Sequence, residues 1–439
     1  MSNFFQLKEN KTTVKTEILA GITTFLATMY IIVVNPGIIS HSGMPFSGIL
    51  TATVLVSAFS SIMMGIYAKN PIVIAPGMGL NAFFTYSVVK GMEVEWTIAL
   101  GAVFWSGIIF IILSVFNIRT EIVKAIPKQI RFAVAAGIGI FITLIGFTDA
   151  GFIIHDPSTL LSMGPLNSIT LTFLAGLAVT AILVALRVKG AIIIGIVTTT
   201  LISIPIGRWY GDASTIVDSI TLVNWNGFFA MPDFSVFFKL KLIESIQLAI
   251  WPVIFAFLFT DLFDSISTFI GVAEAAQLYD TEGEPRNIKQ SLIVDAVSTT
   301  ISGLFGSSSG TSYIESATGI EEGGRSGLTA VVAGLLFLPF MFLSPILSIV
   351  PTIATAPALV IVGAFMMRPV TRINWTRMDD AIPAFLALTL IPLTYNITIG
   401  IIWGLLSWTI IKLVMGHKAA VTPMLIIIDI FAILALIIG

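Results

Sequence analysis

Four acidic residues lie inside stretches of the chain that are otherwise apolar. Asp261 and Asp264 share the run 251–273, and a spacing of three places both carboxylates on one face of a helix. Asp295 lies in the next apolar run, and Glu315 lies in the run after it. Ionisable side chains within a membrane are costly and usually face a cavity or a pathway. We therefore expect Asp261, Asp264 and Glu315 to meet at a site that also handles protons, whereas Asp295 either supports that site or forms a structural hydrogen bond.

Two short segments each carry helix breakers and one central polar side chain. PIVIAPGMGLNAFF (71–84) holds two prolines, two glycines and Asn81, and GSSSGTSYIESATG (306–319) holds Glu315 among glycines and serines. Broken backbone at membrane depth persists only where protein or a cavity satisfies its polar groups. Paired interrupted segments indicate a binding site near the membrane midplane. We expect their freed backbone groups to bind a ligand, although a simple kink at PGMG is the alternative. The candidate positions are Gly79, Ser312 and Ile314.

Residue types elsewhere in the chain argue against other classes of site. His41, His155 and His417 lie at segment ends without the spacing of metal ligands, and the chain has no cysteine. We therefore expect no metal and no cofactor. Phe263 could stack on a flat ligand, but in a chain with 32 phenylalanines packing or lipid contact is the alternative. The sequence contains no nucleophile–base pair and no phosphate-binding loop, so an enzyme is not expected.

Composition indicates the environment of these residues. Of 439 residues, 56% are hydrophobic and 10% are Asp, Glu, Lys or Arg, against about 25% charged in an ordinary soluble domain. The net charge of −2 gives no sign of a nucleic-acid partner. The sequence predicts an all-α polytopic membrane protein in contact with lipid.

A helix needs about 20 apolar residues to cross a bilayer, and the apolar runs provide about fourteen crossings. Residues 327–367 are long enough for two of them, and so are residues 381–411. The tail 419–438 is either a further span or an interfacial helix. The expected reversal points are Pro345, Pro351, Pro392 and Asn396.

Lysine and arginine orient these spans, because cytoplasmic loops are enriched in both. With the N-terminus in the cytoplasm, 18 of the 22 basic residues fall inside, as expected for a multi-pass protein of the cytoplasmic (inner) membrane. The longest polar break, 207–244, lies outside and separates two sets of seven crossings. The halves then have opposite orientations, as inverted repeats do. The basic residues on the outside are Lys90, Arg208, Lys239 and Lys241.

The motifs APGMGLNAFF (75–84), DLFDSISTFIGVA (261–273) and SYIESATGIEEGGRSGLTAVV (312–332) closely resemble those of the AzgA-like purine permeases. These are hypoxanthine, adenine and guanine transporters of the nucleobase–cation symporter-2, or nucleobase–ascorbate transporter, group. The resemblance covers essentially the whole chain. It implies two intertwined inverted repeats of seven spans, as in the uracil permease, with short extended stretches in spans 3 and 10. Position by position, the essential residues of the family match Asn81, Asp261, Asp264 and Glu315.

The resemblance also implies a core domain and a gate domain, each built from both halves. The core takes residues 1–127 (spans 1–4) and 245–350 (spans 8–11). The gate takes residues 128–206 (spans 5–7) and 351–439 (spans 12–14 and the hydrophobic tail). Residues 207–244 would form the extracytoplasmic connector.

The implied function is import of purine nucleobases by proton symport with alternating access, with guanine or hypoxanthine favoured over adenine. Glu315 and Asp261 would accept hydrogen bonds from the ring, and Asn81 would either bind the ring or brace the broken segments. Sodium coupling stays open, as does a sulfate-type anion transporter or channel on the same fold. An anion, however, would favour a buried cation over three carboxylates. The expected partners are the purine, the proton and membrane lipid, with a homodimer left open.

Overall fold

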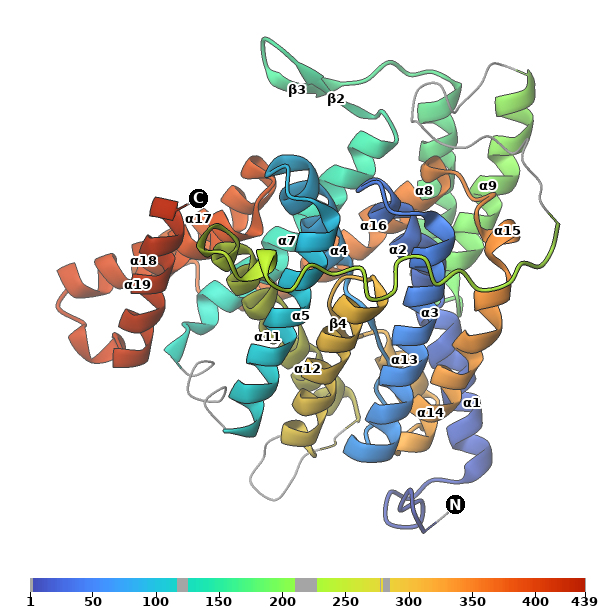
Figure 1. Cartoon of the computed structure of the whole chain (residues 1–439), viewed down its shortest axis with the longest axis horizontal. Coiled ribbons are helices and arrows are strands. Elements are labelled where there is room, and N and C mark those ends of the chain that lie inside the picture. The colour runs from blue at the N-terminus through green and yellow to red at the C-terminus, as the bar shows by residue number, and fades with distance from the viewer. Residues whose placement is uncertain (1–2, 117–124, 210–226, 277, 279–284, 439) are drawn as a thin grey trace.

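The computed structural model describes residues 3–116, 125–209, 227–276, 278 and 285–438. Most of these residues are helical (Figure 1). The first half consists of α1 (Val14–Thr28), α2 (Ile31–Ser40), α3 (Phe46–Met63), η1 (Met64–Ala68), β1 (Ile74–Pro76), α4 (Met78–Ala82), η2 (Phe83–Gly91), α5 (Trp96–Val115), α7 (Lys128–Asp149), β2 (Ile153–Asp156), β3 (Leu160–Met163), α8 (Ser168–Ala185) and α9 (Ala191–Trp209).

The second half contains the short helices η3 (Glu244–Ile246) and η4 (Leu248–Ile250), then α11 (Trp251–Ala276), α12 (Ile288–Phe305), β4 (Gly310–Ser312), α13 (Ser316–Glu321), α14 (Gly327–Phe337), η5 (Leu338–Phe342), α15 (Ser344–Leu347), α16 (Thr352–Met366), η6 (Arg368–Arg372), α17 (Met378–Thr394), α18 (Ile397–Val414), η7 (Lys418–Ala420) and α19 (Pro423–Ile438). In the described part of the chain, eight helices are long and apolar enough to cross a membrane, and three shorter apolar helices accompany them. The predicted helical, polytopic membrane protein is therefore confirmed.

Both expected double crossings reverse inside their apolar runs. The first turns through α15, between η5 and α16. The second turns between α17 and α18, where Tyr395 adopts a left-handed φ of 52° and the Asn396 side chain accepts from the backbone N–H of Thr398 at 2.9 Å. Pro392 lies inside α17, so the left-handed Tyr395 ends this helix, and the Asn396 cap begins α18.

A two-stranded antiparallel sheet joins the two halves. β1 and β4 pair with Ala75 opposite Thr311, and the ladder continues where the Gly77 N–H donates to the Ser309 carbonyl at 3.0 Å. Prolines and glycines in the first segment and glycines in the second disfavour a continuous helix, and each segment runs extended for three residues. The extended stretches expected in spans 3 and 10 are confirmed.

The helices pack in two groups. One contains α1, α3, α5, α12 and α14, and the other contains α7, α8, α9, α16, α17 and α18. Where α5 crosses α12, a Cβ atom on Gly303 would lie 2.7 Å from the backbone nitrogen of Phe104, so glycine permits the close approach. The expected division into a core domain and a gate domain stays a prediction.

A β-hairpin that the sequence analysis did not foresee connects α7 to α8. β2 and β3 project from the helical body (Figure 1). At the turn, Asp156 Oδ1 accepts from the backbone N–H groups of Ser158 at 2.7 Å and Thr159 at 3.0 Å. These bonds favour the charged carboxylate and hold the pKa of Asp156 below its usual value.

The connector between the halves can be followed from residue 227, because residues 210–226 lie outside the described part of the chain. It runs as a long extended path across the face of the helical body seen in Figure 1. The Phe238 N–H donates to the Leu304 carbonyl at 2.8 Å, and Lys241 Nζ lies 2.5 Å from Glu95 Oε2. The connector is thus tied to helices of both halves.

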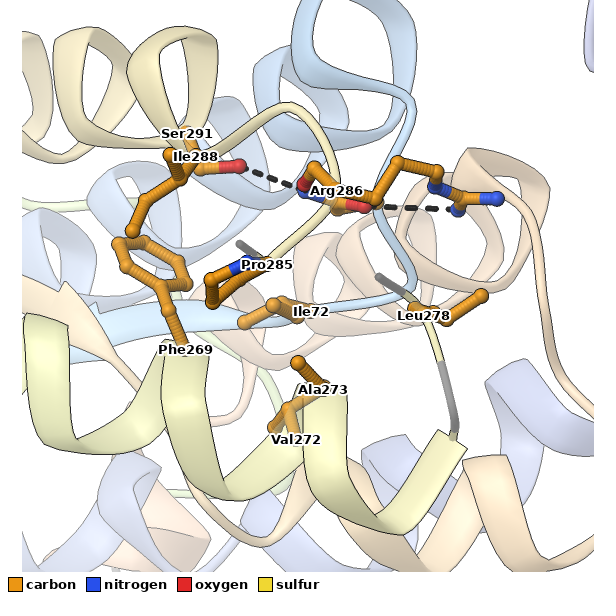
Figure 2. A pocket seen from close by; sticks show the side chains of 10 residues that line it. Ile72, Phe269, Val272, Ala273, Leu278, Pro285, Arg286, Ile288 and Ser291 are labelled. Carbon is orange, nitrogen blue, oxygen red and sulfur yellow. Dashed lines mark hydrogen bonds between the residues drawn. The ribbon is translucent and has the colours of Figure 1, made fainter. Parts of the chain in front are cut away.

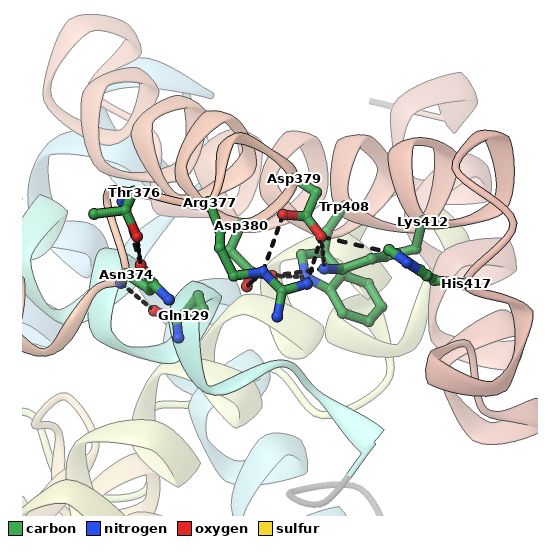
Figure 3. A network of polar contacts seen from close by, with 9 residues as sticks. All are labelled: Gln129, Asn374, Thr376, Arg377, Asp379, Asp380, Trp408, Lys412 and His417. Carbon is green, nitrogen blue, oxygen red and sulfur yellow. Dashed lines mark hydrogen bonds and ion pairs between the residues drawn. The ribbon is translucent and has the colours of Figure 1, made fainter.

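An ion-pair network joins the start of α17 to the end of α18 (Figure 3). Lys412 contacts both Asp379 and Asp380, the latter at 3.0 Å, and Arg377 Nη2 lies 2.8 Å from Asp379 Oδ2. The side chains of Lys412 and Asp379 are nearly buried, whereas that of Arg377 is about half exposed, and together they join α17 to α18.

Candidate functional site

The backbone of the paired strands is bonded within the protein. The Tyr313 N–H donates to the Val73 carbonyl at 2.9 Å, and the Tyr313 hydroxyl donates to the Pro76 carbonyl at 2.6 Å. The Ser61 hydroxyl lies 3.1 Å from both the nitrogen and the oxygen of Ile74. Protein groups therefore satisfy the broken backbone, as membrane depth requires. α4 begins directly after β1, and α13 begins just after β4.

Asn81 braces the two interrupted segments in this structure. It is fully buried in α4, and its Oδ1 accepts a short hydrogen bond from the Ser308 hydroxyl of the chain that leads into β4. Its backbone N–H donates to the Gly77 carbonyl at 2.8 Å. Its Nδ2 has no hydrogen-bond partner among the described residues. This contact agrees with the bracing role left open by the sequence, and the two N–H donors of the Asn81 amide are left over.

Asp295 ties three elements together. It is fully buried in α12, and its two carboxylate oxygens accept from the Ser265 hydroxyl of α11 and from the Ser312 hydroxyl of β4, the latter at 3.0 Å. Ser312 is 2% exposed. Asp295 thus forms the structural hydrogen bonds that were one of its two expected roles. The Ser312 hydroxyl is used as a donor in this arrangement.

Asp261 is also buried beside β4. Its Oδ2 lies 2.5 Å from the hydroxyl of Thr299, which in turn lies 3.1 Å from the Gly310 carbonyl. A threonine hydroxyl has one proton, so it can donate to only one of these acceptors at a time. Thr299 thereby links the state of Asp261 to the backbone of β4.

Asp264 is partly exposed and belongs to a group of interacting carboxylates. Its Oδ2 accepts from the Thr311 hydroxyl of β4 at 3.3 Å. The charges of Asp295 and Glu315 both act on it. Asp295, expected either to support the site or to form a structural bond, thus acts on Asp264 together with Glu315, and the meeting of Asp261, Asp264 and Glu315 at one site stays a prediction.

Glu315 and its neighbour form the open part of this region. Glu315 is half-buried at the start of α13, and its Oε1 accepts from the Tyr30 hydroxyl at 2.7 Å. Ile314 is 39% exposed, although the residues on either side of it in the chain are more buried. The accessible members of the site are Asp264, Ile314 and Glu315.

Two other candidates have packing roles in this structure. Gly79 faces α7, because a Cβ atom there would lie 2.5 Å from Ile138 Cγ2. The glycine therefore allows close contact between α4 and α7. Phe263 is 3% exposed and meets Phe259 edge to face at 5.9 Å, which agrees with the packing alternative.

The partners of these side chains were not identified from the sequence. They are hydroxyl groups from distant segments: Tyr30, Ser265, Thr299, Ser308 and Thr311. Serine and threonine are common throughout the chain, so only the pairing of β1 with β4 singles these residues out. Tyr30 is the last residue of FLATMY (25–30), which is faintly similar to FLFTDL (257–262) around Asp261. That similarity alone did not identify Tyr30 as a partner of Glu315.

A separate small cavity lies between α11 and α12 (Figure 2). It has a volume of about 10 Å³, and Phe269 and Ile72 contribute to its apolar lining. Arg286 lines it too, but its guanidinium donates to the Asn10 side chain at 2.5 Å and to the Arg325 carbonyl at 2.8 Å. The carboxylates described above do not line this cavity.

Comparison with known proteins identifies the family. The Permease family profile matches residues 15–423. Over 440 residues the chain is 39% identical to the adenine permease AdeP of Escherichia coli, covering 100% of this chain and 96% of the relative. It is 40% identical to the guanine/hypoxanthine permeases PbuO and PbuG of Bacillus subtilis, covering 98% of both chains for PbuO and 97% of both for PbuG.

Solved structures show the fold. The transmembrane domain of the cyanobacterial bicarbonate transporter BicA matches with a TM-score of 0.62 at 15% identity, covering 89% of this chain and 97% of that domain. The structure of SLC26A9 matches with a TM-score of 0.59 at 14% identity, covering 92% of this chain and 68% of that one. The expected transporter fold is therefore confirmed.

Proposed function

The chain belongs to the Permease family, and on that premise we propose that it imports purine nucleobases across the cytoplasmic membrane together with protons. The observation that carries the proposal is full-length similarity to purine permeases combined with acidic side chains grouped at the β1–β4 pair. Relatives named for adenine and for guanine/hypoxanthine are about equally similar, at 39% and 40%. The preference for guanine or hypoxanthine stays a prediction.

Glu315 is the group best suited to bind the ring. A purine presents N–H donors in a flat, rigid array, and an ionised carboxylate accepts such bonds strongly. Ile314 offers an apolar surface next to this carboxylate, and Asp264 provides a second accessible carboxylate. Asn81, Asp261, Gly79 and Ser312 are buried in this conformation, where they support the site.

Proton coupling is supported by the grouping of the carboxylates. The charges of Asp295 and Glu315 both act on Asp264. In a medium of low dielectric, ionising all three carboxyl groups is costly, because their negative charges repel one another. Binding of a proton relieves that repulsion. A neutral base carried with one proton gains about 2.3 kcal/mol per 100 mV of membrane potential. Sodium is the alternative coupling ion.

Alternating access is supported by contacts between the two helix groups. The Tyr86 hydroxyl of η2 lies 3.3 Å from Asp149 Oδ2 at the end of α7, and 2.9 Å from His41 Nδ1. The neighbouring Ser87 hydroxyl donates to the Tyr395 carbonyl between α17 and α18. By the predicted orientation these contacts lie on the outer side, so this conformation is closed there.

The solved structures of similar fold include anion transporters. Transport of an anion such as sulfate is therefore the second candidate function. Uptake of labelled hypoxanthine, guanine, adenine and sulfate into cells that lack their own purine permeases separates the two. We expect purine uptake that a protonophore abolishes and that replacement of sodium by potassium leaves unchanged. Sulfate uptake without purine uptake would overturn the proposal, and loss of purine uptake on sodium removal would replace the proton by sodium.

A further inference from the structure

The hydroxyl of Tyr30 is the hydrogen-bond partner that the structure gives Glu315. The donor comes from the first span and the acceptor from the tenth, 285 positions later in the chain, at an oxygen–oxygen distance of 2.7 Å. Tyr30 is 1% exposed, whereas Glu315 is half-buried. The bond therefore joins a fixed, enclosed donor to a carboxylate that borders the open part of the site.

The backbone around Tyr30 explains why the side chain is held there. α1 ends at Thr28 and α2 begins at Ile31, so the first span is interrupted at this residue. The Ile32 N–H donates to the Met29 carbonyl and the Val33 N–H donates to the Tyr30 carbonyl, both at 3.1 Å. This is the tighter i→i+3 pattern that often marks functional positions within helices.

Only one oxygen of Glu315 is used by this contact. Oε1 accepts from the Tyr30 hydroxyl, and no other side chain of the described residues donates to this carboxylate, whose remaining donor is the backbone N–H of Glu315 itself. The hydrogen bond to Oε1 restricts rotation about the Cγ–Cδ bond of Glu315. Oε2 therefore points in a defined direction. Glu315 is thus arranged to accept one further donor from outside the protein.

We propose that Tyr30 is a positioning residue for substrate: it holds Oε1 of Glu315 so that Oε2 accepts a ring N–H of the purine. The inference rests on the proposed function and deepens it, since it assigns part of the specificity to a residue that does not itself touch the ring. Purines that lack the N–H facing Oε2 are rejected because the fixed carboxylate cannot turn to another donor.

Tyr313 provides a matched control. Its ring centroid lies 6.5 Å from that of Tyr30 and it is 6% exposed, but its hydroxyl donates to the Pro76 carbonyl and not to Glu315. Tyr313→Phe removes a buried phenol hydroxyl in the same region and leaves the Tyr30–Glu315 bond in place.

The test measures dissociation constants of purified protein for hypoxanthine and for hypoxanthine methylated singly at N1, N7 or N9. In the unchanged protein we expect at least one methyl group to weaken binding about tenfold or more, the value of a hydrogen bond to a charged group. We call the ratio of the dissociation constants of methylated and unmethylated hypoxanthine the methyl penalty. In Tyr30→Phe we expect hypoxanthine itself to bind about tenfold more weakly and the methyl penalty to shrink severalfold. In Tyr313→Phe the methyl penalty should persist.

Two results would overturn the inference while leaving purine transport intact. One is an undiminished methyl penalty in Tyr30→Phe, and the other is tighter binding of hypoxanthine by that variant, which would make Tyr30 a competitor of the substrate. Should Tyr30→Phe fail to reach the membrane, Tyr30→Met fills similar space without a donor and has the same expected outcome. No binding of any purine by the unchanged protein would instead refute the proposed function.

Discussion

The acidic residues of this site differ in how they are held. Asp295 accepts from two serine hydroxyls and is fully buried. Among the described residues, Asp264 accepts from the Thr311 hydroxyl, Glu315 accepts from the Tyr30 hydroxyl and its own backbone N–H, and both carboxylates remain partly exposed. A carboxylate whose oxygens are occupied supports structure, whereas one with a spare acceptor can bind a ligand or a proton. This distinction predicts different consequences for apparently similar substitutions.

Glu315→Gln should lower purine uptake about a hundredfold or more, because it removes both a charged acceptor and a group that can take up a proton. The amide has nearly the same size, so folding should be little affected. Uptake assays paired with quantification of the protein in the membrane test this. Normal uptake at normal abundance would remove Glu315 from the site.

Asp295→Ala should act on stability. The Ser265 and Ser312 hydroxyls would lose their acceptor in a buried environment, at a cost of about 1–3 kcal/mol each. We expect a lower melting temperature of the detergent-solubilised protein than for Glu315→Gln. Equal melting temperatures for the two variants would contradict the structural role of Asp295.

At the scale of elements, the decisive feature is that β1 and β4 pair across the two halves. The breakers in 71–84 and 306–319 were enough to predict that both segments are interrupted, because proline and glycine act locally. The extended stretches followed from the family resemblance. The partners Tyr30 and Thr299 could not be predicted, since they depend on how distant helices pack. The β2–β3 hairpin was missed because its strands are four residues long and its apolar residues continue those of the neighbouring spans.

The contact of α4 with α7 predicts the effect of a methyl group at Gly79. Gly79→Ala would place a Cβ atom 2.5 Å from Ile138 Cγ2, and overpacking of this kind costs about 1–3 kcal/mol. If the two helix groups must move past each other, uptake should slow about tenfold. Ile138→Ala in the same chain removes the clash and should restore uptake. Failure of the second substitution to help would assign Gly79 a different role.

At the scale of the whole molecule, the lipid environment made the sequence easy to interpret. Apolar runs of membrane length and the bias of basic residues predicted the helical membrane architecture that the structure and the fold comparison support. The conformational state could not be predicted, because it depends on a few contacts between helix groups such as Tyr86 with Asp149. The orientation in the membrane and any dimer remain predictions.

Locking the outer contact should stop transport. The chain contains no cysteine, so Tyr86→Cys with Asp149→Cys gives two unique thiols that a bifunctional maleimide can join. We expect the double variant to take up purine before cross-linking and not afterwards, while each single variant is unaffected by the reagent. Continued uptake by fully cross-linked protein would mean that these elements do not separate during the cycle.

Purified protein reconstituted into liposomes provides the most direct measurement of the central claim. With an imposed inward proton gradient, the account predicts that labelled hypoxanthine, guanine or adenine accumulates against its own gradient, and that Glu315→Gln abolishes this accumulation. The account would be contradicted if purine only equilibrated across the membrane, with or without a proton gradient. It would also be contradicted if the vesicles accumulated sulfate and excluded every purine.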